Sequence, residues 1–184
     1  QKGSEVSPKK THHLSLDKTI EDLRKKYSEN ISRNLKKFQK SGINVNTSKS
    51  VSDLIGLFRN NKGSTIDTLK EEDYKTLQKL SALASKRNDL TVLETRNESG
   101  QLIAGAMFVR SFNSYIFLFS AVCEEAREKG AMTGIIDRFI EMHAGEKNVL
   151  DFEGSMIPDL ARFYKSFGSE EIVYLQIRRN NLPP

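Results

Sequence analysis

The sequence predicts an α+β domain with a mixed, mostly antiparallel central sheet and helices on both faces. Residues 102–111 and 115–122 are apolar on both faces of the predicted strands, which is typical of strands covered from both sides. Short turns join these two segments to residues 90–96, so the three strands are expected to form an antiparallel meander. The chain of 184 residues is long enough for one compact domain and short for two.

Before the meander, the sequence divides into three parts. Residues 1–18 begin with a stretch rich in Ser, Pro, Lys and Gly and are expected to be a mobile N-terminal segment. Residues 19–42 are predicted to be a basic amphipathic helical arm that Gly42 ends, with one apolar stripe formed by Leu23, Tyr27, Ile31, Leu35 and Phe38. Residues 43–180 form the domain proper. It is expected to start with a strand at 43–45 and helices at 52–59 and 68–86, the second opened by a Thr68–Glu71 capping box.

After the meander, helical and strand patterns alternate. A helix is predicted from about Gly130 to Gly145, followed by a strand at 149–153, a helix from Pro158 to Gly168 and a closing strand at 172–178. The strand–helix–strand unit from residue 115 to residue 153 should be a right-handed parallel crossover. The sheet must change its pairing beside this unit, and a ligand cleft is expected there.

The charge is concentrated at the start of the chain. Residues 1–50 hold 12 of the 29 Lys and Arg and 5 of the 24 Asp and Glu, a net charge of +7, so the remaining 17 and 19 leave −2 for residues 51–184. A basic helix can contact RNA phosphates or an anionic membrane, or it can simply present a solvated face, and the pattern leaves all three open.

Other features limit the class of protein. No apolar stretch approaches the roughly 20 residues that span a bilayer, so no membrane span is expected. The single cysteine, Cys123, cannot form an internal disulfide, which favours a reducing, cytoplasmic location. His12, His13 and His143 lack the spacing of metal ligands, so no metal is expected.

The first candidate for chemistry is the loop from Cys123 to Met132, which follows the strand ending at Val122 and precedes a helix. Free backbone N–H groups at the start of a helix form an anion site, and Arg127 and Lys129 add positive charge. Gly130 is expected to let the backbone approach an anion. The alternative is an ordinary charged connection.

The second candidate is the pair Asp151 and Glu153, two residues apart on a predicted strand and therefore on one face. Two close carboxylates repel, so one pKa should rise, and such a group can accept a proton from an amine. Glu153, nearer the expected cleft, is the preferred base. The alternative is that both are solvated or paired with Arg127 or Lys165.

Two segments resemble the GNAT superfamily of N-acyltransferases. Residues 127–132, Arg-Glu-Lys-Gly-Ala-Met, are similar to that family's pyrophosphate loop and depart from it at Met132. Residues 160–168 resemble its late helix, in which a tyrosine protonates the departing thiolate, and Tyr164 is the residue that aligns. Tyr164 also shares a stripe with Leu160 and Phe167 and can instead fill the core. The resemblance implies acyl-CoA as donor, held by Val122, Cys123, Arg127, Lys129, Gly130, Ala131 and Met132.

Residues 28–42 and 151–155 also resemble the second half of Fem-type peptidyltransferases, which carry two GNAT-like halves in tandem. This likeness, over about residues 12–180, implies that the chain is the second half of a larger transferase or a shortened relative. It also implies aminoacyl-tRNA as an alternative donor, in keeping with Met132 and the basic arm. The interpretation is transfer of an acyl or aminoacyl group to an amine of a small molecule or peptide, with Glu153, Tyr164 and Asp151 as catalytic residues. The rival is a binding module that keeps the fold without catalysis.

Overall fold

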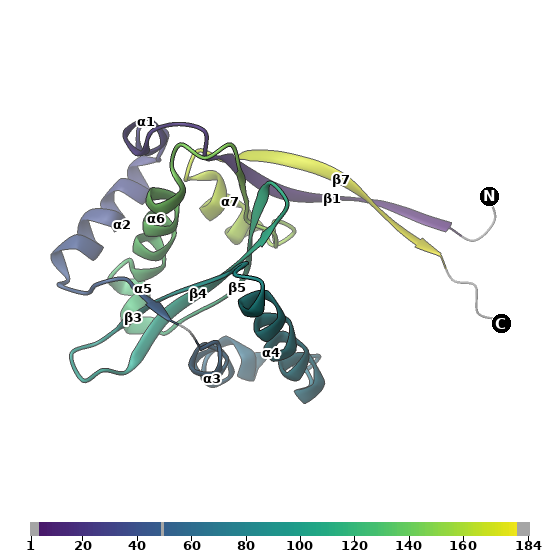
Figure 1. Cartoon of the computed structure of the whole chain (residues 1–184), viewed down its shortest axis with the longest axis horizontal. Helices are drawn as coiled ribbons and strands as arrows, with labels where there is room; N and C mark the ends of the chain where they lie inside the picture. The colour runs from purple at the N-terminus through teal and green to yellow at the C-terminus, as the bar shows by residue number, and fades with distance from the viewer. Residues whose placement is uncertain (1–3, 49, 180–184) are drawn as a thin grey trace.

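The computed structural model describes residues 4–48 and 50–179. Within them, one seven-stranded sheet has the order β2-β3-β4-β5-β6-β1-β7 (Figure 1). Neighbouring strands are antiparallel except for the parallel pair β5 and β6, so the predicted mixed, mostly antiparallel sheet is confirmed. The strands are β1 (Ser4–Ser15), β2 (Asn46–Ser48), β3 (Leu90–Arg96), β4 (Leu102–Ser111), β5 (Ser114–Val122), β6 (Val149–Asp151) and β7 (Glu170–Arg179).

Helices cover the sheet on both sides, as the apolar pattern of the central strands requires. The larger core joins the sheet to α1, α2, α6 and α7, and Phe108 of β4 belongs to it. A smaller core on the other face joins α3 to the sheet with α4 packed against it, and Met107 points into it. The helices are α1 (Ile20–Arg24), α2 (Glu29–Lys40), α3 (Ser52–Asn60), α4 (Glu71–Lys86), α5 (Glu124–Glu128), α6 (Ala131–His143) and α7 (Pro158–Lys165), with a 3-10 turn at Lys62–Thr65.

The predicted meander is confirmed, and it contains one irregularity. Met107 pairs with Phe119 and Phe108 pairs with Phe117, so Leu118 is an extra residue in β5. Such a β-bulge bends the strand and re-aims the residues after it. The bend lies directly before the segment of β5 that leaves its neighbour β6.

The N-terminal prediction is wrong for the residues that the structure describes. Ser4–Ser15 is not a mobile segment but strand β1, which lies between β6 and β7 (Figure 1). β1 pairs with β7 from Ser4 to His13 and with β6 from His13 to Ser15. The strand has a polar, proline-containing sequence, and its partners come from the far end of the chain, so local sequence patterns gave no sign of it. Residues 1–3 lie outside the described part.

The predicted basic helix is two helices and belongs to the body of the fold. The chain breaks between α1 and α2, where the Ser28 hydroxyl caps the new helix by accepting from the Ile31 N–H. Ile31 and Phe38 of α2 are buried in the larger core, and the Phe38 ring fills the space beside Gly134 of α6. Its basic side chains remain on the outside, as the amphipathic pattern predicts.

An ion pair between the partly exposed Arg24 and the buried Asp137 links α1 to α6. The Nε–H and an Nη2–H of Arg24 donate to the carboxylate of Asp137, at 2.9 and 2.7 Å, and the Tyr27 hydroxyl donates to the same carboxylate at 3.1 Å. Asp137 is only 5% exposed. A carboxylate with this little solvent is stable only because three donors replace water.

Several predicted boundaries shift. The strand expected at 43–45 forms at Asn46–Ser48, and the strand expected to reach Glu153 ends at Asp151. Helix α4 begins at Glu71, where Asp73 accepts from the Lys70 N–H, instead of at the expected Thr68–Glu71 box. None of the helices within residues 4–48 and 50–179 is both long and apolar enough to cross a membrane.

Candidate functional site

The site begins where β5 and β6 part. The two parallel strands pair only from Ser114 to Ile116 on β5, and among residues 4–48 and 50–179 no strand pairs with the rest of β5 on that side. The Cys123 N–H donates to the Ile103 carbonyl of β4 at 2.9 Å. Because successive residues of a strand direct their N–H groups to opposite neighbours, the N–H of Val122 faces the opening. Backbone donors are therefore available along this edge.

Two cavities meet at this opening, one on each face of the sheet. The first, the α6-side cavity, has a volume of about 370 Å³ and is lined by α2, β5, α6 and α7. The second, the α4-side cavity, has about 390 Å³ and is lined by α3, α4, β5, α7 and the residues after β6. Both volumes are at the small end of the range for ligand sites. Four residues line both cavities: Phe117, Ser120, Leu160 and Tyr164.

Tyr164 stands between the two cavities. Its ring stacks on Phe152 at 4.8 Å between centroids and meets Phe117 edge-on at 5.9 Å, and the residue is 5% exposed. Burial raises the pKa of Tyr164 to about 12. The phenol therefore stays protonated at neutral pH and can donate its proton or a hydrogen bond. Within the described residues its hydroxyl has no hydrogen-bond partner, so it is free for a ligand.

Glu153 lies at the mouth of the α4-side cavity. It follows the end of β6 with φ of 49°, and Gly154 continues in the left-handed region at 56°. A non-glycine residue in this region is strained and marks a position that its surroundings impose. Burial, and then the charge of Asp151, raise the pKa of Glu153 above its ordinary value. The predicted direction is thus present, although loss of solvent contributes more than the neighbouring carboxylate.

Both carboxylate oxygens of Asp151 already have partners within the protein. One carboxylate oxygen accepts from the Thr11 hydroxyl at 2.5 Å and from the Glu153 N–H at 3.0 Å, and the other lies 3.3 Å from His13 Nε2. It lines neither cavity. These contacts suit a group that holds the turn bearing Glu153 in place.

The segment predicted to be a loop from Cys123 to Met132 contains helix α5 and the start of α6, and it contributes Arg127, Gly130 and Met132 to the α6-side cavity. Gly130 has φ of 71°, as a tight turn into a helix requires. Its free side, however, faces α2: a Cβ there would lie 2.5 Å from the Asn34 carbonyl oxygen. Glycine is therefore necessary at this position because helix α2 packs closely against it. The sequence alone instead predicts that an anion approaches the backbone here.

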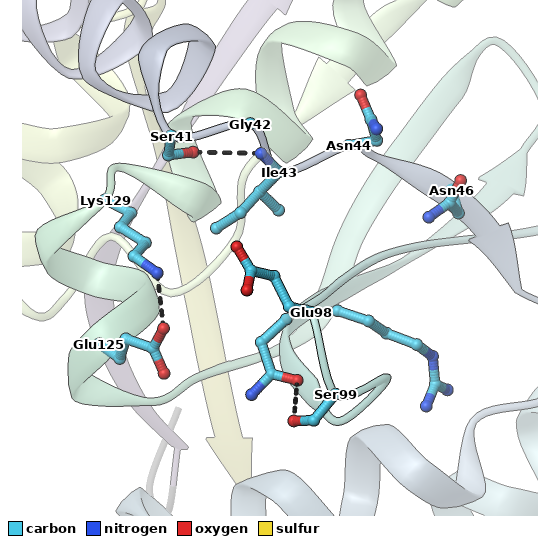
Figure 2. A pocket seen from close by; sticks show the side chains of 11 residues that line it. Ser41, Gly42, Ile43, Asn44, Asn46, Glu98, Ser99, Glu125 and Lys129 are labelled. Carbon is cyan, nitrogen blue, oxygen red and sulfur yellow. Dashed lines mark hydrogen bonds and ion pairs between the residues drawn. The ribbon is translucent and has the colours of Figure 1, made fainter.

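Lys129, predicted to join the same site, lies elsewhere. Its ammonium pairs with Glu125 at 2.6 Å beside a third cavity, of about 690 Å³ (Figure 2). That cavity lies between the end of α2, the turn of the β3–β4 hairpin and α5, and Glu98 of the hairpin turn also lines it. Its lining includes neither Tyr164 nor the open edge of β5, so we do not place the chemistry there.

The remaining predicted residues are less accessible. Cys123 is half-buried and packs against the larger core, with its N–H already bonded to β4. Ala131 is fully buried in the first turn of α6, and Val122 lines the α6-side cavity. In the part of the chain that the structure describes, no cluster of three His, Cys, Asp or Glu side chains could hold a metal.

Sequence reasoning missed several residues at the site. Ser120 interrupts an apolar strand, which was an available signal, and it lines both cavities. Asn34 and Thr133 line the α6-side cavity, and His13 approaches the Asp151 carboxylate. Asn34 and His13 are brought in by α2 and β1, whose positions no local pattern predicts.

A mixed sheet that opens between two parallel strands, with one cavity on each face and a protonated tyrosine between them, has the architecture of the N-acyltransferase fold. The chain belongs to the acetyltransferase (GNAT) domain family, whose model matches residues 25–154. The matched residues include β5 and β6, the two strands that border the opening of the sheet.

Solved structures show the same fold at low sequence identity. FemX aligns with 88% of this chain at a TM-score of 0.65 and 12% identity. L-PGS from Bacillus licheniformis aligns with 98% of this chain at a TM-score of 0.63 and 13% identity. A putative acetyl transferase from Pyrococcus furiosus aligns over 70% of this chain and 93% of its own chain. Its TM-score is 0.50 and its sequence identity is 16%. The chain spans 59% of FemX and 63% of L-PGS, so it corresponds to part of each. No curated protein sequence matches the chain.

Proposed function

We propose that this domain is an N-acyltransferase that moves an acyl or aminoacyl group through the opening between β5 and β6 to an amine. The observation that carries the proposal is the position of Tyr164, which borders both the α6-side and the α4-side cavity. A donor in one cavity and an acceptor in the other would meet at this residue. Such positioning makes the reaction effectively intramolecular.

The reaction follows from the groups at the opening. The acceptor nitrogen attacks the donor carbonyl and forms the C–N bond, while the carbonyl oxygen takes a hydrogen bond from the Val122 N–H on the open edge. Glu153 accepts the proton that the amine loses. The bond to the leaving sulfur or oxygen breaks, and Tyr164 gives its proton to that atom. Both proton transfers match the pKa shifts, because Glu153 is raised toward a useful base and Tyr164 remains protonated.

For the donor, we propose acyl-CoA. Its acyl group and adjoining chain would enter the α6-side cavity, and its phosphates would lie outside, near Arg127 and the first turn of α6. The cavity of about 370 Å³ suits this inner part of the molecule.

Aminoacyl-tRNA is the second candidate, and one observation favours it. Asn34 of α2 lines the α6-side cavity, so the donor cavity opens beside the basic outer face of that helix. Four basic side chains on α2 are exposed and form no ion pair with any described residue: Arg33, Lys36, Lys37 and Lys40. An unpaired basic strip next to a donor site suits a nucleic-acid backbone.

A thermal-shift series with acetyl-CoA, longer acyl-CoAs and charged tRNA tests the donor. A donor at 100 times its Kd adds about 2.7 kcal/mol of stability, which for a domain of this size raises the Tm by roughly 5–10 °C. Filling the opening by Ser120→Phe should abolish the shift, whereas Ser111→Phe, exposed at the far end of β4, should leave it unchanged. No shift with any donor would favour the non-catalytic binding module.

Catalysis is tested on a donor that binds. Tyr164→Phe keeps the ring on Phe152 but removes the proton, so turnover should fall about 10²-fold or more with donor affinity near wild type. Glu153→Gln should lower turnover on a similar scale and remove the acidic limb of the pH–rate curve. In the wild type that limb should lie above the ordinary glutamate pKa, since only the ionised carboxylate accepts a proton. Full activity in both variants would rule out these roles.

A further inference from the structure

The strands β1 and β7 form a ribbon that leaves the body of the domain. β1 pairs with β6 only from His13 to Ser15, and before that point its partner is β7 alone. The two strands project together well beyond the helices (Figure 1). A two-stranded ribbon is marginally stable in water unless one of its faces is packed against something.

The two faces of this ribbon differ in chemistry. Residues directly opposite each other in an antiparallel pair point to the same face. On one face Val6 lies opposite Ile177 and Pro8 lies opposite Leu175. On the other face Ser7 lies opposite Gln176, and Tyr174 lies opposite Lys9. One face therefore carries an apolar row along β7 and the outer part of β1, with Lys10 beside it opposite Val173, and the other face is mixed and mostly polar.

The apolar row continues the face of the sheet that α1, α2, α6 and α7 cover. Leu14 of β1 has the same alternation as Val6, and it is 2% exposed in the larger core. Beyond the helices the row is uncovered: Val6 is 55% exposed, Val173 57%, Leu175 65% and Ile177 67%. A contiguous apolar strip on an isolated element marks an interaction surface.

Charges at the two ends of the row identify the partner. On β7 the residues of this face are Glu171, Val173, Leu175, Ile177 and Arg179. The row is thus acidic at one end, apolar in the middle and basic at the other. A second row stacked antiparallel about a two-fold axis at Leu175 brings Val173 opposite Ile177 and Glu171 opposite Arg179.

We propose that the apolar face of the β1–β7 ribbon binds the same face of a second copy of this chain in a two-fold symmetric dimer. The surface is self-complementary, as an isologous contact requires. Within one chain Glu171 already pairs with Lys10 at 2.9 Å, and its side chain is 44% exposed, which leaves it accessible to Arg179 of the second copy.

The dimensions predict a weak dimer. At about 3.4 Å per residue the eight residues from Ser4 to Thr11 are about 27 Å long, and two strands make a strip about 10 Å wide. The area that two such strips bury is below the roughly 1,200 Å² at the low end of stable, specific interfaces. The equilibrium should therefore depend strongly on protein concentration.

Sedimentation velocity over a roughly hundredfold range of concentration tests the proposal on the whole chain. The wild type should shift from monomer to dimer as the concentration rises. Leu175→Asp, in the middle of the apolar face, should weaken the dimer at least tenfold. Tyr174→Asp, an adjacent exposed position on the opposite face, should change the dimer constant by less than about threefold. Circular dichroism confirms that both variants are folded, which is expected because both side chains are exposed.

The orientation has its own test. Arg179→Glu should weaken the dimer by placing two acidic groups together, and adding Glu171→Lys in the same chain should restore it. A wild type that stays monomeric at every concentration overturns the proposal, as does a dimer that Leu175→Asp leaves intact. If Leu175→Asp abolishes the dimer but neither charge change alters its dissociation constant, the antiparallel arrangement is wrong.

Discussion

Replacing Gly130 by alanine separates two explanations of this glycine. If its role is to let an anion approach, a small side chain should reduce donor binding and leave stability nearly unchanged. In the structure, however, a Cβ would lie 2.5 Å from the Asn34 carbonyl oxygen and 3.2 Å from its carbonyl carbon. These are backbone atoms of α2, so they cannot rotate away. The substitution must push α2 from α6.

The expected loss of stability has two parts. A left-handed backbone with a side chain costs about 1–2 kcal/mol, and overpacking against α2 costs about 1–3 kcal/mol more. Gly100→Ala is the matched control, because Gly100 has φ of 78° but nothing within 4 Å of the added Cβ. It should show the first part alone.

Urea unfolding followed by circular dichroism measures both variants. We expect Gly130→Ala to lose about 2 kcal/mol more than Gly100→Ala, a further drop in Tm of about 4–8 °C for a chain of this length. Equal losses in the two variants would refute the packing explanation. The loop would then owe its glycine to the turn, or to a ligand if donor binding fell as well.

Three further predictions concern other parts of the molecule. Asp137→Ala should lower the free energy of unfolding by about 2 kcal/mol in urea titrations, because the buried Tyr27 hydroxyl loses its acceptor and Arg24 keeps only Glu141 as a partner; a loss below about 1 kcal/mol would contradict this role. Burial lowers the pKa of His12, which is 2% exposed, below its ordinary 6.5. The unfolded chain therefore binds a proton on His12 more readily than the folded chain does. The contribution of neutral His12 to the free energy of unfolding is fully present above pH 6.5, and it is lost as the pH falls from 6.5 through the lower pKa of His12 in the folded chain. His12→Gln should reduce the slope of Tm with pH in that range. An unchanged slope would mean that other groups cause the pH dependence of Tm. Finally, Lys36→Glu with Lys37→Glu should weaken any binding of charged tRNA several-fold, and the wild-type affinity should fall steeply with salt; salt-independent binding would exclude the helix as a contact.

The parts of the fold that depend on neighbouring residues were predictable from the sequence. The strands 90–96, 102–111 and 115–122 were predicted from apolar segments joined by short turns, and the parallel crossover from the change to a helical pattern; the structure has these strands within one residue of the expected bounds. Their burial on both faces also correctly predicted two layers of helices. In each case the signal lies within a few residues of the feature that it predicts.

Features built from distant segments were not predictable in the same way. The composition of β1 predicts a polar, flexible segment, because the residues that it pairs with, such as Arg179 opposite Ser4, lie far away in the sequence and leave no local signal. The same distance hides His13 from Asp151 and Asn34 from Gly130. The left-handed turn at Gly130 was foreseeable from its position before a helix. What occupies the space beside it depended on where α2 docks.

The place of β1 in the sheet also affects how the chain can fold. This strand precedes every other described element of the domain, yet both of its neighbours in the sheet, β6 and β7, are the last two strands of the domain. Its backbone groups can pair only with strands more than 130 residues further along the sequence, and closing such distant contacts slows folding. β7 pairs with β1 alone, so a chain shortened by its first strand would lose the attachment of its last strand as well. Expression trials that trim the N-terminus should therefore treat residues 4–15 as part of the sheet.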